Sequence, residues 1–147
     1  MGLKDIINEP NRRPAVIQDC MNLIDSEVKG KGGLSGVAVK GAYKIVKAIK
    51  PGIIREAVDR LLEPFVGKLE PFYDEWKSGG GDHGFDRFLD GRKNEVANAL
   101  LGVTDERAAK ADNATLKKAY KGLRPKAVGH VEHAVPGVGR IIEKHAG

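Results

Sequence analysis

The stretch VAVKGAYKIVKAI, residues 37–49, decides the fold class, because it suits a β-strand as well as a helix. Read with period two, the apolar side chains that alternate around Gly41 are Val37, Val39, Tyr43 and Ile45. At 100° per residue, Lys40, Lys44 and Lys47 share one face, and the opposite face holds Ala38, Ala42, Ile45, Val46 and Ile49. A lone strand would find no partner elsewhere in the chain. We therefore predict a helix here.

The remaining chain repeats this helical spacing, and no other segment competes for a sheet. The sequence predicts an all-α fold, an irregular bundle of six to eight helices, several of them short. At 147 residues and 41% apolar content, residues 1–147 are expected to form a single domain. SGGGDHG, residues 78–84, is expected to be a flexible connection within it.

Prolines and capping residues mark the expected helix ends. Pro64 and Pro71 each begin a short helix or kink a longer one, and Pro136 ends a helix that Pro125 opens. Thr104 and Asp112 are typical N-cap residues and predict two further helices. Most of the aromatic side chains fall within residues 65–88, where they are expected to pack in the core.

Composition limits the cellular locations that we expect for the protein. Charged residues make up 31% of the chain, and no run reaches the ~18 apolar residues of a membrane span. The single cysteine, Cys20, excludes an internal disulfide and favours a reducing, cytoplasmic location. Cys20 also lies on the apolar stripe of its helix, so we expect a packed core thiol.

The net charge of +5 is concentrated in two blocks. Residues 29–50 hold six lysines and no acidic residue, and residues 117–147 hold seven Lys or Arg against Glu132 and Glu143. Such blocks are usually solvated surface. They are also what an anionic partner requires, whether nucleic acid, membrane surface or acidic protein. Both readings stay open at this point.

The segment AVPGVGRII, residues 134–142, resembles the helix-hairpin-helix motif of DNA-binding proteins, with flanking residues from 126 to 144. In that motif, glycines let the turn approach a phosphate, and amide groups of the next helix point at the anion. The resemblance implies phosphate contacts from Gly137, Gly139 and Arg140, with Lys126 nearby. A helix stop made of proline and glycine is the alternative.

The other candidate sites lack the residues that a defined binding or catalytic site would need. Residues 29–36, KGKGGLSG, could cradle a phosphate or simply connect two helices. His130 and His133 are spaced to share a helix face, but no further zinc ligands accompany them, so no metal site and no cofactor are expected. No catalytic residue is assigned. Ala42-Tyr43-Lys44 recurs as Ala119-Tyr120-Lys121, and the frequency of alanine and lysine in this chain makes coincidence the simpler account.

Three longer runs carry a resemblance over nearly the whole chain. They are GLSGVAVKGAYKIVKAIKPG (33–52), LLEPFVGKLEPFYDEW (61–76) and NATLKKAYKGLRPKAVGHVEHAVPGVGRII (113–142). Together they resemble an uncharacterised bacterial family of small helical proteins. The resemblance implies a bacterial cytoplasmic protein and brings no activity or site residues with it.

The function hypotheses fall into three non-enzymatic classes, and an enzyme with a constellation hidden by sequence order stays open beside them. The first is a basic helical module that binds nucleic-acid backbone or another polyanion weakly and without sequence preference. Its expected contacts are Lys40, Lys44, Lys47, Lys126, Gly137, Gly139 and Arg140. The second is a helical interaction or scaffold protein, with a protein partner or self-association. The third is reversible membrane-surface association through the lysine-rich helix.

Overall fold

The computed structural model describes residues 2–81 and 83–146, with the side chains of residues 33–35 outside that description. Its helices are α1 (Leu3–Ile7), α2 (Arg13–Gly30), α3 (Gly33–Lys47), α4 (Ile53–Ser78), α5 (Phe85–Asp90), α6 (Lys93–Lys110), α7 (Ala114–Leu123), the 3-10 helix η1 (Arg124–Lys126) and α8 (Ala127–Ala146). No strand occurs among the described residues. The all-α prediction is confirmed, and residues 37–47 belong to a helix, as their 3.6-residue spacing predicts.

Local chemistry explains several helix boundaries. Pro14 occupies the first turn of α2, where its missing N–H costs no hydrogen bond. Gly52 joins α3 to α4 with φ 74°, a left-handed conformation that favours glycine. The Asn113 side chain caps α7 by accepting a 3.0 Å bond from the Leu116 amide. The predicted caps Thr104 and Asp112 are wrong: Thr104 lies inside α6, where its hydroxyl donates to the Leu101 carbonyl at 3.1 Å.

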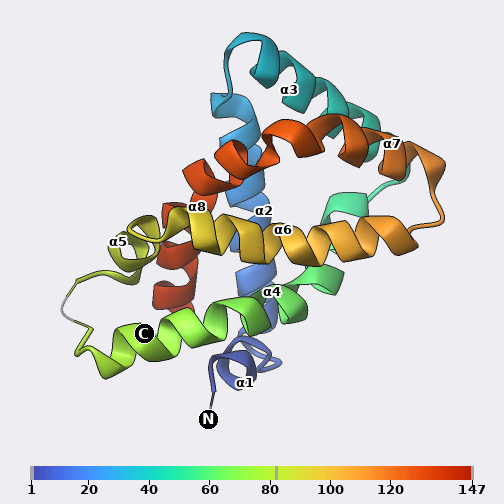
Figure 1. Cartoon of the computed structure of the whole chain (residues 1–147). Helices are drawn as coiled ribbons and strands as arrows, with labels where there is room; N and C mark the ends of the chain where they lie inside the picture. The colour runs from blue at the N-terminus through green and yellow to red at the C-terminus, as the bar shows by residue number, and fades with distance from the viewer. Residues whose placement is uncertain (1, 82, 147) are drawn as a thin grey trace.

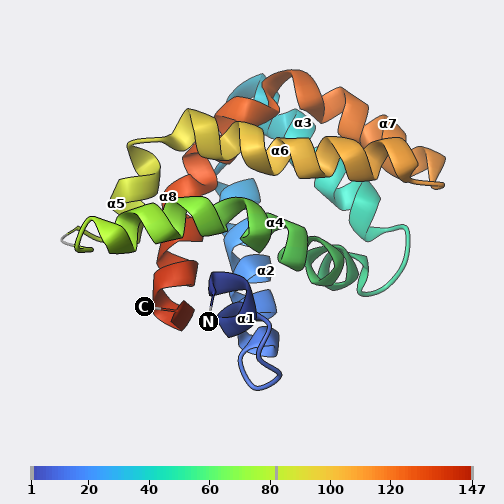
Figure 2. The same ribbon diagram turned by 60° about the horizontal axis from the view of Figure 1, so that its bottom comes forward.

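Three prolines lie inside helices instead of ending them. α4 contains Pro64 and Pro71 and continues for 26 residues, which is the kinked-helix alternative. The prediction that Pro136 ends a helix is wrong, because α8 runs through it to Ala146. Proline has a helical φ, so it removes one backbone hydrogen bond and bends the helix without having to end it. Figure 2 shows α4 lying across the view in its C-terminal half and turning away in its N-terminal half.

One core cluster contains side chains from α1, α2, α4, α5, α6 and α8. α8 crosses behind α6 and packs most extensively against α5 (Figure 1). Tyr73, Trp76 and Phe85 form the aromatic centre of the core, with ring centroids 5.2–5.7 Å apart. Phe65, Phe72 and Phe88 pack against it, so the predicted core role of the aromatics within residues 65–88 is confirmed.

The glycine-rich connection that follows α4 folds back onto Trp76, near the end of that helix. The Gly81 amide donates to the Trp76 carbonyl at 3.1 Å, and the Trp76 indole donates to the His83 carbonyl at 2.6 Å. Gly80 and Gly81 adopt positive φ, which closes the turn. Residue 82 lies outside the described residues. Core side chains come from both sides of this connection.

Candidate functional site

Helices α3 and α7 lie side by side at one end of the molecule (Figure 1). Neither helix contains an acidic residue. Their exposed lysines, together with one from η1, form what we call the lysine face: Lys40, Lys44, Lys47, Lys117, Lys118, Lys121 and Lys126. None of these seven ammonium groups has an ion pair with a residue that the structure describes. The packing therefore joins two basic blocks that are about 70 residues apart in the chain.

A second junction between the basic blocks lies at His130 of α8. Burial lowers the pKa of His130, and the charges of Lys31 and Lys126 lower it further. Lys31 connects α2 to α3, and Lys126 ends η1. Lys31 and His133 of α8 contact the same Glu27 oxygen, at 3.4 and 2.7 Å, so the start of the first block lies beside the second. His130 itself interacts with neighbouring groups.

Each basic helix is held by a tyrosine that reaches back to the preceding helix. The Tyr43 hydroxyl donates to Asp25 Oδ1 at 2.6 Å, and the Tyr120 hydroxyl donates to Asp105 Oδ1. Asp25 is followed by five residues of α2, and Asp105 by five residues of α6. Both of these helices are 18 residues long. The repeated Ala-Tyr-Lys sequence thus has the same structural role twice.

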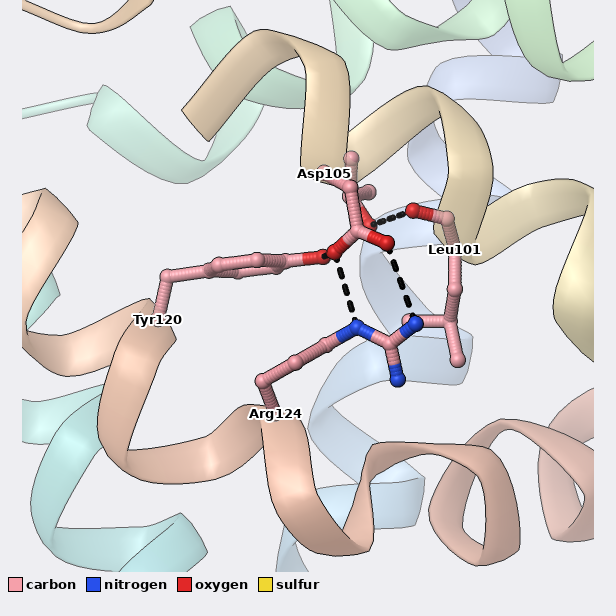
Figure 3. Close-up of polar contacts among 5 residues, drawn as sticks. Leu101, Asp105, Tyr120 and Arg124 are labelled. Atoms are coloured by element: carbon pink, nitrogen blue, oxygen red, sulfur yellow. Dashed lines mark hydrogen bonds and ion pairs between the residues drawn. The ribbon is translucent and has the colours of Figure 1, made fainter. Parts of the chain in front are cut away.

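The Asp105 cluster has the larger number of partners (Figure 3). Arg124 donates from Nε to Asp105 Oδ1 at 2.8 Å and from Nη2 to Oδ2 at 3.0 Å. The hydroxyls of Thr104 and Tyr120 are 2.7 Å apart. Hydrogen bonds from Arg124 and Tyr120 hold the pKa of Asp105 below its usual value. The charge of Arg124 is balanced by Asp105, so the positive charge of this face comes from the lysines, which have no ion pair within the part of the chain that the structure describes.

The predicted hairpin at Pro136–Gly139 is wrong, because these residues lie within α8. Gly137 and Gly139 are buried against neighbouring helices. A Cβ on Gly137 would lie 2.5 Å from Leu23 Cδ1, and one on Gly139 would lie 2.6 Å from Asp86 Cα. Their amides are part of a continuous helix, which directs each N–H at a carbonyl one turn back. Both glycines serve helix packing, and neither is placed to approach a phosphate.

Four of the remaining predicted contacts lie together, and the fifth, Arg140, lies apart from them. Lys40, Lys44, Lys47 and Lys126 belong to the lysine face. Arg140 lies 14 residues beyond Lys126, roughly 20 Å along the helix axis. It is exposed and pairs with Asp86 at 3.5 Å. Arg140 therefore belongs to the packing of α5 on α8.

The connection between α2 and α3 is shorter than residues 29–36 predicted, since only Lys31 and Gly32 lie outside the two helices. The Lys31 ammonium is 3.4 Å from Glu27. His133 also contacts Glu27, with Nδ1 2.7 Å from Oε1. No group of three potential metal-ligating side chains occurs among the described residues.

Comparison with known families covers almost the entire chain. The model of a family described as "Family of unknown function (DUF6918)" matches residues 3–146. The chain belongs to this family. No curated protein and no solved structure matches it. The match confirms the resemblance drawn from the three long runs, which was to an uncharacterised family. The family's description names no activity that could be compared with the lysine face. Within the described residues, no helix is long and apolar enough to cross a membrane.

The contacts expected from the sequence leave out the α7 lysines, although the second basic block contains them, and the two tyrosine–aspartate contacts were not foreseen. Both had a signal. Residues 113–131 contain no acidic residue, and the Ala-Tyr-Lys repeat marks the tyrosines. No sequence signal marked the aspartates, because nothing local distinguishes Asp25 or Asp105 from other acidic residues on helix surfaces.

Proposed function

We propose that this protein binds the phosphate backbone of nucleic acid through the lysine face, without reading base sequence. The observation that supports the proposal is the contact between α3 and α7, two helices without acidic residues that both expose lysines lacking an ion pair with any described residue. Lysine ammonium groups on such a surface neutralise phosphates and release bound counterions. Backbone contacts of this kind carry no base information, so duplexes of different sequence bind alike.

Fluorescence anisotropy with a labelled DNA duplex tests the proposal at low and then physiological salt. Each phosphate contact contributes about −0.9 to the slope of log affinity against log salt. The variant Lys44→Glu/Lys121→Glu removes one lysine from each helix and should weaken binding and flatten this slope by about 2. Arg87→Glu/Lys93→Glu is the matched control, since it makes the same change in net charge at exposed residues of α5 and α6 that have no ion pair with a residue that the structure describes. No binding at low salt, or equal losses in both variants, contradicts the proposal.

One observation favours a second candidate, reversible association with an anionic membrane surface. Val37 and Ile45 of α3 are 70% and 53% exposed, beside Lys40 and Lys44. Ile45 belongs to the apolar side predicted for this helix, and the structure leaves it exposed. A basic helix with exposed apolar side chains can lie in a lipid headgroup layer. Cosedimentation with vesicles containing phosphatidylserine tests it: Val37→Ser/Ile45→Ser should reduce vesicle binding and leave duplex binding unchanged.

A further inference from the structure

An open groove of about 1130 Å³ lies between α4, α6 and α7, and Lys117 is the lysine-face residue among its described lining residues. Its floor is apolar, formed by Ile53, Ala57, Leu61, Val103 and Leu116. Ala57 is exposed, and Leu61 and Leu116 are half-buried, so part of this apolar surface faces solvent. Exposed apolar surface collected in one groove is typical of an interaction site.

The bent helix α4 forms one wall of this groove. Pro64 lies inside α4 and lines the groove. Pro64 and Pro71 have no N–H to donate, so the carbonyls one turn earlier, on Arg60 and Gly67, lose their usual helical donor. Arg60 and Gly67 both line the groove. The N-terminal half of α4, which runs in a different direction from the C-terminal half, lines the groove together with α6.

Basic side chains dominate the walls. Among the described lining residues, six are basic and three are acidic. Glu56 is shared between Lys50 at 2.7 Å and Arg60 at 2.9 Å, and Glu106 pairs with Lys110 at 3.2 Å. Lys68 on α4 and Arg107 on α6 are exposed and have no ion pair with a described residue. Unneutralised positive charge therefore comes from both helices that wall the apolar floor.

We propose that this groove binds an amphipathic α-helix of a partner protein, with Asp or Glu on both sides of the helix's apolar stripe. An amphipathic helix needs only one face covered, and its apolar residues at i, i+3, i+4 and i+7 fit an apolar floor. Acidic side chains on either side of that stripe then meet the basic residues of α4 and α6. Charge complementarity of this kind selects the partner and its orientation.

The same features count against two other occupants. A long-chain carboxylate needs most of its surface enclosed, because small-ligand sites bury ~70–90% of the ligand. This groove leaves its floor partly open to solvent. A second copy of the chain is disfavoured by charge. A two-fold contact would face the basic walls with each other, and the exposed apolar residues of α3 lie beside lysines.

A synthetic helical peptide provides the test. The groove follows α4 from Ile53 to Lys68, about 22 Å of helix, so a fluorescein-labelled peptide of about 15 residues spans it. The probe carries leucine at the i, i+3, i+4 and i+7 positions and glutamate beside them. One control peptide has lysine in place of every glutamate, and another has the same composition with its leucine pattern scrambled. We expect both controls to bind at least about 10-fold more weakly, as loss of about 1.4 kcal/mol implies.

Protein variants locate the site. Lys68→Glu/Arg107→Glu should weaken binding of the glutamate peptide by at least about 10-fold, and Ala57→Trp should block the floor from an exposed position. Arg87→Glu/Lys93→Glu, with the same change in net charge, should bind the peptide nearly as well as wild type. Amide NMR shifts should concentrate in residues 53–68 and 103–117. Lys44→Glu/Lys121→Glu should keep peptide binding, which separates this proposal from duplex binding.

Four outcomes overturn the proposal. They are absence of binding by the glutamate peptide, equal binding by the lysine peptide, equal binding by Lys68→Glu/Arg107→Glu, and shifts elsewhere in the protein. Titration with sodium dodecanoate tests the long-chain carboxylate: groove shifts with it, and none with the peptide, assign the groove to an acyl chain. Sedimentation velocity tests the second copy: self-association that Ala57→Trp abolishes assigns the groove to a dimer contact.

Discussion

Gly139 of α8 packs directly on the backbone of Asp86 in α5. A Cβ on Gly139 would lie 2.6 Å from the Asp86 Cα and 2.9 Å from its amide nitrogen. Backbone atoms cannot move aside as a side-chain end can, so α5 and α8 would have to separate. We expect Gly139→Ala to lower the free energy of unfolding by about 1–3 kcal/mol, the usual cost of overpacking. Urea unfolding followed by circular dichroism measures this.

Gly129 is the matched control on the same helix, because it is exposed and a Cβ there would meet nothing within 4 Å. Gly129→Ala should stabilise the protein by about 0.5–1 kcal/mol, since alanine is the better helix former. Equal effects from both substitutions would contradict the packing role of Gly139.

Removing the Tyr120 hydroxyl should loosen α7 from α6. Tyr120→Phe deletes the bond to Asp105 and the contact with Thr104, while the ring keeps its place. We expect a loss of about 0.5–1.5 kcal/mol in the free energy of unfolding, the net value of a typical hydrogen bond. A double-mutant cycle with Asp105→Asn checks the origin of the loss. Additive effects of the two substitutions would show that the hydroxyl and the carboxylate do not interact.

Tyr43 should make stability fall at alkaline pH. Burial and the bond to Asp25 raise the pKa of Tyr43 from 10.0 to about 12. The folded state therefore holds this proton while the unfolded state loses it, and the stabilisation is lost as pH rises from 10 toward 12. Tyr43→Phe should show a shallower fall in this interval, measured by urea unfolding at several pH values. Parallel profiles for the two proteins would refute the assignment.

His130 should oppose folding in mild acid. Its pKa lies below the ordinary value of 6.5, so the unfolded state binds the proton more readily. Stability is then lost as pH falls below about 6.5 and recovers as pH rises. His130→Gln should reduce this dependence, which urea unfolding at several pH values measures. An unchanged pH dependence in His130→Gln would contradict this role.

Cys20 should react slowly with thiol reagents. The side chain is half-buried against the core, and burial, followed by the neighbouring Asp19 charge, raises the pKa of the thiol from 9.0 to about 11. The thiolate is the reactive form. Two pKa units imply about 100-fold less thiolate near neutral pH than in the unfolded chain. Equal labelling rates with and without urea would contradict this environment.

Periodicity in the sequence determined the fold class, because helix formation depends on spacing that is local and regular. Residues 37–47 show this, since their 3.6-residue pattern outweighed an alternation typical of a strand. The same local rules misjudged Pro136, Thr104 and Asp112. A proline or a capping residue is compatible with a helix end but does not require one. α8 continues through Pro136, where it packs against α5 and α2.

The sequence by itself also determined that the positive charge lies in two acid-poor blocks. Only the tertiary structure decided that these blocks meet, through the contact of α3 with α7 and through His130. It likewise decided that Gly137 and Gly139 are packing residues, and that a groove lies between α4 and α6. The physical reason is the same in each case. Charge and helix propensity are properties of neighbours in the chain, whereas a shared surface depends on which helix faces cover each other.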